Sequence, residues 1–336
     1  MRLASRDDGT RDGRLLLVSA DLARSIEADA AHTLQQALDH WSEVQPWLQA
    51  EASRLERVAD LAAFPFDPAQ CLAPLPRGHQ WLDGSAYLNH VSLVRRARGA
   101  ALPPSLTTDP LMYQGASDHF LAPMAPIRVA DESFGIDLEG ELGVITDDVP
   151  LDADAATAAD AIRLLVLVND VSLRELIPGE LTKGFGFVQS KPASALAPVA
   201  VTPDEIGAAW DGRRAHLTLL AGIDDTPLGR LATGPDMTFD FPTLIAHAAR
   251  TRPLGAGTLI GSGTVSNADG DDPGRPLAEG GRGYACIAEQ RMAETIRYGE
   301  PRTAYLGFGD RVHLEAFDAR GRTVFGRIDQ RVEPIP

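Results

Sequence analysis

Disulfides and membrane spans are the first features that this sequence lacks. Only two of its 336 residues are cysteine, Cys71 and Cys286, and they match no CxxC or zinc-binding spacing. Neither a disulfide framework nor a structural zinc site is therefore expected. No apolar run approaches the roughly 20 residues of a membrane span, and the run at 15–18 is too short for a signal peptide. These absences predict a cytoplasmic protein in a reducing compartment.

Positive charge is also scarce. The chain has 31 lysines and arginines against 47 aspartates and glutamates, which gives a formal net charge of −16. Such a surface repels nucleic-acid phosphates and anionic membranes, so neither is expected as a partner. A bound cation would neutralise part of this charge. The 31 glycines and 24 prolines are spread along the chain, which argues against long disordered segments.

The N-terminal region differs in pattern from the rest of the chain. Residues 21–62 are rich in Ala, Leu, Glu and Gln with apolar positions at helical spacing, which predicts helices broken near Pro46. Four prolines then predict a linker, because proline lacks the backbone donor of a helix or central strand. They are Pro65, Pro68, Pro74 and Pro76. We therefore expect a small, partly helical N-terminal domain at 1–75 and a larger domain at 76–336.

Short apolar runs rich in β-branched residues dominate the larger region and predict strands. They are RLLVLVND (163–170), APVAVTP (197–203), AHLTLLAGI (215–223), GAGTLIGSGTVSN (255–267) and RVHLEAFD (311–318). Helical patterns are fewer, at 87–98, 151–166 and 241–251. The sequence thus predicts a β-rich α+β fold with peripheral helices, and it contains no GxGxxG or P-loop motif.

The stretch GIDLEGELGVITDDVP, at 135–150, places acids at every second position: Asp137, Glu139 and Glu141. Side chains alternate between the two faces of a strand, so the acids share one face and apolar residues share the other. One interpretation is a half-buried strand whose acidic face is solvated. The alternative is a set of acids gathered for chemistry.

A second acidic group follows the apolar run that begins at Leu164. This run predicts a buried strand that ends at Asn169 and Asp170, although that pair alone is typical of a turn. Carboxylates that converge at the edge of a core lose hydration and repel one another, so protons, hydrogen bonds or a cation must compensate them. Oxygen ligands without clustered cysteine or histidine favour magnesium, calcium or manganese over zinc or copper.

A third segment, WLDGSAYLNH, places Asp83 seven residues before His90. A single histidine among the eight in this chain is more often a surface or core residue than a base. His90 is therefore a candidate only in combination with the other segments.

Together these segments resemble the fumarylacetoacetate hydrolase family. The resemblance rests on the order and spacing of the ExE strand DLEGELGVI, the strand end NDVSLRE, Lys191 further along the chain and the glycine-rich GSGTVSN. It spans roughly residues 80–300, and the first 75 residues match no motif. The family implies a mixed β-sandwich roll for the catalytic domain, usually paired in a homodimer.

The resemblance also implies a divalent metal ion held by carboxylates. By position these are Glu139, Glu141, Asp170 and Asp83. Asp83 is chosen because the family has the same seven-residue spacing between a metal-binding aspartate and the catalytic histidine. Asp118, in YQGASDHF, is the alternative to Asp83.

Catalytic roles follow from the same resemblance. His90 would be the base that deprotonates the attacking water, and Glu289 would orient His90. Glu279 competes with Glu289 for this role, because the loop at 267–283 differs in length from the family pattern. Lys191 would stabilise negative charge on the substrate or help to protonate the leaving carbon.

Three further positions resemble residues that line the substrate pocket of the family: Tyr113, Arg174 and Thr264. One departure concerns Ile177, which stands where the family pattern has a pocket glutamine. This replacement leaves the identity of the substrate open.

The function that the resemblance implies is metal-dependent hydrolysis of a carbon–carbon bond in a β-diketo acid. Fumarylacetoacetate or an acylpyruvate, formed in the breakdown of aromatic compounds, would be the substrate. The first alternative is a keto-acid decarboxylase or isomerase, or a sugar-acid dehydratase, of the same superfamily. His90 discriminates between them, because a dehydratase could do without this base. The alternative from another class is a non-catalytic metal-binding protein.

Overall fold

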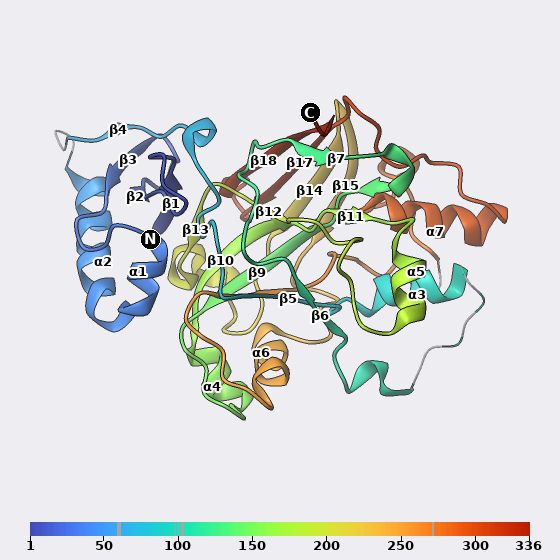
Figure 1. Ribbon diagram of the computed structural model, residues 1–336, viewed down its shortest axis with the longest axis horizontal. Coiled ribbons are helices and arrows are strands. Elements are labelled where there is room, and N and C mark those ends of the chain that lie inside the picture. Colours follow the sequence, from blue (N-terminus) through green and yellow to red (C-terminus); the bar gives the residue numbers. More distant parts are fainter. Residues whose placement is uncertain (59–61, 98, 100, 102–103, 271) are drawn as a thin grey trace.

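A computed structural model of the protein describes residues 1–58, 62–97, 99, 101, 104–270 and 272–336. Figure 1 shows an N-terminal lobe of strands and helices beside a larger body built around long strands. In these described ranges, no helix is both long enough and apolar enough to cross a membrane.

A large mixed sheet carries the acidic segment. In spatial order its strands are β4 (Phe64–Pro65), β3 (Arg24–Glu27), β2 (Arg14–Val18), β1 (Arg2–Arg6), β13 (Ala200–Val201), β10 (Ile162–Asn169), β9 (Gly140–Thr146), β16 (Thr258–Gly261), β5 (Gln80–Gly84) and β6 (Met112–Gly115). Off this path, β12 (Ala195–Leu196) pairs with β10. The β16–β5 pair is parallel and the other pairs are antiparallel. The N-terminal strands therefore extend the sheet that holds the acids.

A second sheet packs against the first. Its strands, in spatial order, are β15 (Thr226–Ala232), β14 (Thr218–Ile223), β17 (Arg311–Phe317), β18 (Thr323–Pro334) and β7 (Ile127–Val129). A small separate pair consists of β11 (Ser172–Leu173) and β8 (Ile136–Asp137). At Gly140 the two sheets approach so closely that a Cβ atom would lie 3.0 Å from Leu219 and 3.1 Å from Leu314. This sandwich confirms the predicted β-rich α+β fold.

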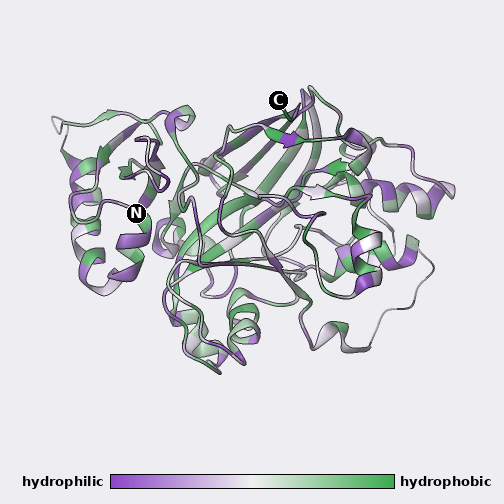
Figure 2. Ribbon diagram, in the orientation of Figure 1, coloured by the Kyte–Doolittle hydropathy of each residue, from purple (hydrophilic) through white to green (hydrophobic). Residues whose placement is uncertain are grey.

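Helices lie around the two sheets. They are α1 (Leu34–Asp39), α2 (Trp41–Arg57), α3 (Leu88–Ala97), α4 (Ala155–Asp160), α5 (Ile177–Lys183), α6 (Phe241–Ala249) and α7 (Ile287–Tyr298). Short 3₁₀ segments lie at Pro68–Gln70, Pro104–Thr107, Glu132–Phe134, Pro203–Ala209 and Leu277–Glu279. Figure 2 shows hydrophobic residues along the long central strands and mixed residues along α2 and α7. Because α3 packs on α7, side chains from these two helices can meet.

The N-terminal region contains more strand than the sequence indicated. The expected helical segment 21–62 begins with β3, and the strands β1 and β2 precede it. Pro46 lies inside α2 without ending it, because the buried face of Leu48, Ala52 and Leu55 packs on the sheet and outweighs one lost hydrogen bond. Residues 59–61 of the expected segment lie outside the described part of the chain.

Two of the three helices expected in the larger region are confirmed, as α3 and α6. Residue 98, the last of the first prediction, lies outside the described residues. The third prediction, 151–166, was too long: α4 ends at Asp160 and β10 begins at Ile162. The run from Leu164 to Val168 is fully buried in the sheet between β9 and β13, so strand pairing and burial override helix formation there.

Candidate active site

The acidic segment is buried, so the interpretation as a strand with a solvated acidic face is wrong. The exposed fraction is 0% for Asp137, 4% for Glu139 and 0% for Glu141. The segment is also split between β8 and β9, and Glu139 lies in the break. There the side chain of Asn169 accepts a hydrogen bond from the backbone N–H of Glu139 at 3.1 Å. The end of β10 therefore fixes the position of Glu139.

Three carboxylates from three neighbouring segments meet at the end of the large sheet. Asp83 comes from β5, Glu141 from β9 and Asp170 from the end of β10, and one oxygen of each lies within 4.8 Å of the others. Strand β16 separates β5 from β9, and its Gly261 allows the approach, because a Cβ atom there would lie 2.3 Å from Asp83 Oδ1. We call Asp83, Glu141 and Asp170 the carboxylate cluster.

The cluster is short of hydrogen-bond donors. Asp83 accepts one hydrogen bond from the backbone N–H of Gly263 at 3.0 Å. Neither carboxylate oxygen of Glu141 has a hydrogen-bond partner among the described residues, although both are buried. A buried carboxylate without donors is costly unless it takes up a proton or binds a cation. The all-oxygen ligand set fits a hard divalent ion such as Mg²⁺, Ca²⁺ or Mn²⁺.

Asp170 accepts more hydrogen bonds than Asp83 or Glu141. Its Oδ1 accepts a hydrogen bond from Ser194 at 2.7 Å, and its Oδ2 accepts from Tyr113 at 2.5 Å and from Lys191 at 2.5 Å. Ser194 was not among the site residues predicted from the sequence, although the pattern SKPAS places it three residues after Lys191.

The electrostatics of the cluster favour uptake of positive charge. Burial, followed by the proximity of Asp170, raises the pKa of Asp83 well above its usual value. The pKa of Glu141 is also raised well above its usual value, mainly by burial and next by the nearby Asp83. The pKa of Asp170 is raised by burial, with Lys191 opposing the shift. The raised pKa values show that the cluster disfavours unpaired negative charge, so a proton or a divalent cation stabilises it.

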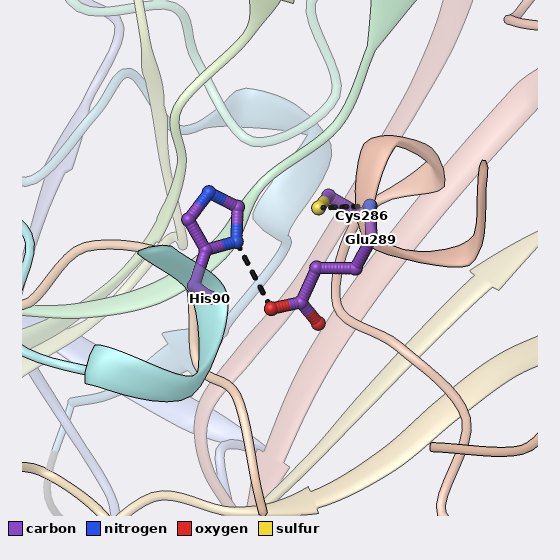
Figure 3. A group of neighbouring side chains, drawn as sticks. All are labelled: His90, Cys286 and Glu289. Carbon is purple, nitrogen blue, oxygen red and sulfur yellow. Dashed lines mark hydrogen bonds and ion pairs between the residues drawn. The ribbon is translucent and has the colours of Figure 1, made fainter. Parts of the chain in front are cut away.

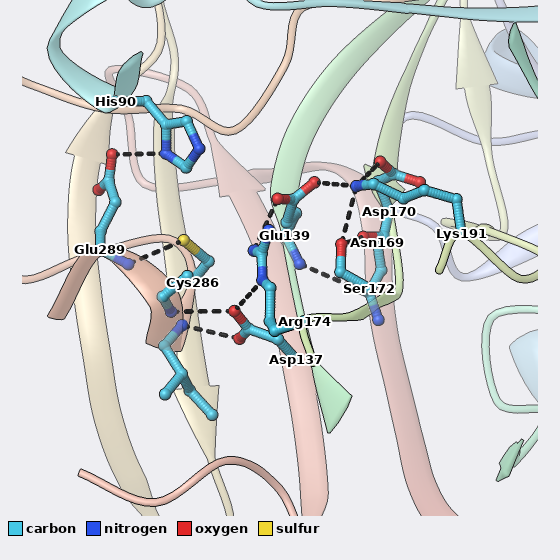
Figure 4. A network of polar contacts seen from close by, with 12 residues as sticks. His90, Asp137, Glu139, Asn169, Asp170, Ser172, Arg174, Lys191, Cys286 and Glu289 are labelled. Carbon is cyan, nitrogen blue, oxygen red and sulfur yellow. Dashed lines mark hydrogen bonds and ion pairs between the residues drawn. The ribbon is translucent and has the colours of Figure 1, made fainter. Parts of the chain in front are cut away.

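The other two acids of the segment have protein partners. Figure 4 shows Arg174 between Asp137 and Glu139: Nε lies 2.8 Å from Asp137 Oδ2, and a terminal nitrogen lies 2.6 Å from Glu139 Oε1. Asp137 also accepts hydrogen bonds from the backbone N–H groups of Ile287 and Ala288, at 2.8 and 2.9 Å. Asp137 therefore links Arg174 to the first turn of α7 and is not solvated.

Lys191 is the second cation of the site. Its ammonium donates to Glu139 at 2.7 Å, to Asp170 at 2.5 Å and to Ser172 at 2.7 Å. Burial raises the pKa of Glu139, but Arg174 and Lys191 outweigh this and hold it below its usual value. Burial alone would lower the pKa of Lys191, but Asp170 and Glu139 outweigh burial and raise this pKa above its usual value. Glu139, expected as a ligand, is thus held by two cations beside the cluster.

A histidine–glutamate pair faces the same region. His90 Nδ1, on α3, lies 2.9 Å from Glu289 Oε1, on α7 (Figure 3). Glu289 is buried, whereas 18% of the His90 side chain is exposed. Glu279 lies instead in an exposed 3₁₀ segment, 3.9 Å from Arg297. Of the two glutamates considered from the sequence, Glu289 is the one that contacts His90.

A cavity of about 170 Å³ is lined by Asp83 and His90, whereas Glu141, Asp170 and Glu289 are not among its lining residues. The residues expected at the site that line it are Asp83, His90, Tyr113, Glu139, Arg174, Lys191 and Thr264, together with Ile177. Phe187, which was not expected, also lines it and packs edge-on against Tyr113 with ring centroids 5.3 Å apart. Asp118, the alternative to Asp83, is exposed and does not line this cavity.

Comparison with known proteins identifies the family of the chain. Residues 80–333 match the family described as fumarylacetoacetate (FAA) hydrolase, C-terminal, and residues 1–77 match fumarylacetoacetase N-terminal domain 2. The chain belongs to the fumarylacetoacetate hydrolase family. The N-terminal match was not foreseen, because the first 75 residues carry no catalytic motif.

Relatives of this fumarylacetoacetate hydrolase family protein include a 2,4-didehydro-3-deoxy-L-rhamnonate hydrolase of Sphingomonas sp. (strain SKA58). It is 26% identical over 228 residues, which cover 66% of this chain and 74% of the relative. A Burkholderia ambifaria protein named as a hydrolase is 30% identical over 159 residues, which cover 46% of this chain. The chain spans about half the length of that relative, 53%.

Two solved structures share the fold over the whole chain. Maleylpyruvate hydrolase from Sphingobium sp. SYK-6, in complex with manganese and pyruvate, has a TM-score of 0.64 and 16% identity. Fumarylacetoacetate hydrolase from Exiguobacterium antarcticum has a TM-score of 0.66 and 18% identity. In both cases all of this chain and all of the other chain are covered.

Proposed function

We propose that the protein is a metal-dependent hydrolase that cleaves a carbon–carbon bond in a β-diketo acid of the fumarylacetoacetate or acylpyruvate type. The main support is that His90, which pairs with Glu289, and Asp83 of the buried carboxylate cluster line one cavity of about 170 Å³. A base and a cation site at one cavity are what hydrolysis of a diketone requires.

The ion would be held by Asp83, Glu141 and Asp170, with Glu139 as the neighbouring fourth carboxylate. We propose Mg²⁺, Mn²⁺ or Ca²⁺, because the ligands are carboxylate oxygens alone. Once bound, such an ion would supply a Lewis acid for the diketone. The manganese in the maleylpyruvate hydrolase structure is consistent with this ligand class.

His90 would activate the attacking water. Its Nδ1 is engaged by Glu289, which leaves Nε2 to accept the proton from water. The buried carboxylate fixes the ring and stabilises the imidazolium that forms, as in other histidine–carboxylate pairs. The water oxygen bonds to one carbonyl carbon, the adjacent carbon–carbon bond breaks, and its electron pair remains on the departing fragment as an enolate.

The cationic side chains would bind the substrate and its developing charge. Lys191 carries an ammonium group at the wall of the cavity and can stabilise the enolate before a proton reaches its carbon. Arg174 can bind a substrate carboxylate while Asp137 holds its guanidinium in place. Tyr113 and Thr264 would complete the pocket, and Ile177 would give it an apolar wall in place of the amide found elsewhere in the family.

Substitution of His90 tests this assignment. In His90→Ala, kcat should fall by about 10²- to 10⁴-fold, whereas KM and Mn²⁺ affinity should stay close to wild type, because a base acts in the transition state. The substrates are fumarylacetoacetate, fumarylpyruvate and a short acylpyruvate, with Mg²⁺ or Mn²⁺ present. His216→Ala is the matched control, since His216 lies 2.8 Å from Asp211 at the surface.

Two outcomes would contradict the hydrolase assignment. His90→Ala could retain near-normal hydrolysis, or the wild-type protein could act only on oxaloacetate or a sugar acid. The second outcome would favour the decarboxylase, isomerase or dehydratase alternatives. If the protein binds metal but turns over none of these compounds, the non-catalytic alternative gains support.

We also propose that the protein is a homodimer, as the family resemblance implies. Sedimentation or light scattering at micromolar concentration should then give twice the 35.9 kDa mass of one chain. A mass near 35.9 kDa would contradict this assembly.

A further inference from the structure

Cys286 lies beside the proposed base, although the proposed reaction does not use its sulfur. It is the residue before α7, and its Sγ accepts a hydrogen bond from the backbone N–H of Glu289 at 3.4 Å. Its Sγ, a ring nitrogen of His90 and a carboxylate oxygen of Glu289 all lie within 4.8 Å of one another. Figure 3 shows the three side chains grouped between α3 and the start of α7.

These three ligand atoms differ in kind from those of the carboxylate cluster. One nitrogen, one sulfur and one oxygen suit Zn²⁺, whereas three carboxylates suit harder ions. With zinc bonds of about 2.0–2.3 Å, ligand atoms at a tetrahedral centre lie roughly 3.3–3.7 Å apart. The ligand atoms of Cys286, His90 and Glu289, which lie within 4.8 Å of one another, would thus need to close by up to about 1.5 Å. His90 borders the cavity, which gives an ion access and leaves a fourth position for water.

We propose that Cys286, His90 and Glu289 form an inhibitory binding site for zinc, distinct from the carboxylate cluster. An ion held there occupies the lone pairs of His90 and Glu289, so the pair can no longer take a proton from water. The inference extends the proposed function by adding a second ion with the opposite effect on turnover. Its binding test below does not depend on catalysis.

The surroundings of the sulfur are compatible with metal binding. Burial raises the pKa of the Cys286 thiol, with nearby Asp137 adding to the shift, so the group is a thiol until an ion displaces its proton. The resulting thiolate would accept the Glu289 N–H and lie at the positive end of the twelve-residue helix α7. Both features stabilise negative charge on sulfur.

Cobalt spectroscopy tests the site directly. Co²⁺ is added to the full-length protein saturated with Mg²⁺, and a bound thiolate is detected as a sulfur-to-cobalt charge-transfer band in the near ultraviolet. One equivalent should give this band in the wild type and in Cys71→Ser, because Cys71 lies in the N-terminal region, away from the cavity. Cys286→Ser should give no band. A band of equal strength in Cys286→Ser would overturn the proposal.

Zinc inhibition provides the functional readout. Cys286→Ser should keep basal turnover, because a serine hydroxyl also caps a helix. Its apparent affinity for inhibitory zinc should fall by at least about tenfold, since loss of even an outer-shell partner costs this much. Excess Mg²⁺ should not relieve inhibition of the wild type. Relief by Mg²⁺, or equal inhibition of Cys286→Ser, would place zinc on the carboxylate cluster and overturn the proposal.

Discussion

The two halves of the acidic segment differ in how their charge is compensated. Asp137 and Glu139 are held by Arg174, and Lys191 adds a second cation at Glu139. Glu141, two residues further along, has no hydrogen-bond partner for either carboxylate oxygen among the described residues. The charge of the first half is therefore compensated by basic side chains, whereas the charge of Glu141 calls for a proton or for the proposed cation.

The difference also appears in the charge balance of the site. Five buried acids lie at the carboxylate cluster or against Arg174: Asp83, Asp137, Glu139, Glu141 and Asp170. Among the described residues, the lysine and arginine side chains that form ion pairs with them are Lys191 and Arg174. Burying such an excess of negative charge requires protons or a cation. Arg174 and Lys191 together do not balance five acids, and this imbalance supports the proposed cation.

Of the changes predicted here, Glu141→Gln should have the largest effect, because it removes an acid of the half that has no basic partner. Loss of a ligand should lower metal-dependent turnover by about 10²- to 10³-fold, because a bound ion contributes several kcal/mol to the transition state. The metal-free variant should be at least as stable as wild type, because a neutral amide costs less to bury than an unpaired carboxylate. Steady-state kinetics, Mn²⁺ titration and urea unfolding measure these effects. Unchanged metal affinity would contradict the assignment.

Asp137→Asn should have the opposite effects: it should lower stability and leave metal binding unchanged. Removing one partner of a buried ion pair should lower the free energy of unfolding by about 3 kcal/mol, and Asp137 also loses acceptor capacity for the first N–H groups of α7. Metal affinity should remain close to wild type. Asp118→Asn is the control, because Asp118 is an exposed acid outside the cavity. If Asp137→Asn lost metal binding without losing stability, the proposed division of the acidic segment into a stabilising half and a metal-binding half would be wrong.

The stabilisation of the folded protein by bound metal should depend on pH, and this effect should be smaller than those of the two substitutions. The pKa values of Asp83 and Glu141 are raised by burial and neighbouring acids, so the metal-free folded protein binds more protons there than the unfolded chain. Its stability should therefore decline as the pH rises from about 4 through the raised pKa values. Bound metal removes this penalty. The increase in Tm caused by Mg²⁺ should accordingly be larger at about pH 8 than at about pH 5.

The lowered pKa of Glu139 acts in the opposite sense. Burial opposes ionisation, but Arg174 and Lys191 dominate, so its contribution to stability is present above its unfolded pKa and is lost on acidification. This contribution does not depend on the metal. A metal-induced change in Tm that was equal at both pH values would show that the cluster is already ionised and compensated without an ion.

Local pattern and motif order were enough to predict much of the fold and the candidate residues. The alternation of acids in 135–150 and the apolar run before Asp170 both depend on residues close in sequence. The partners of the acids could not be predicted, because they come from distant segments: Ile287, which donates to Asp137, is 150 residues away. The strands β1 and β2 were missed because their burial depends on pairing with β13 and packing of α2.

Crystals grown with Mn²⁺ and measured for anomalous scattering test the central claim most directly. We expect one strong peak per chain, bonded to oxygens of Asp83, Glu141 and Asp170 at about 2.0–2.6 Å. Lys191 and Arg174 should remain beside Glu139 or Asp137. A peak bonded elsewhere, or a Glu141 carboxylate that does not touch the ion, would contradict the account.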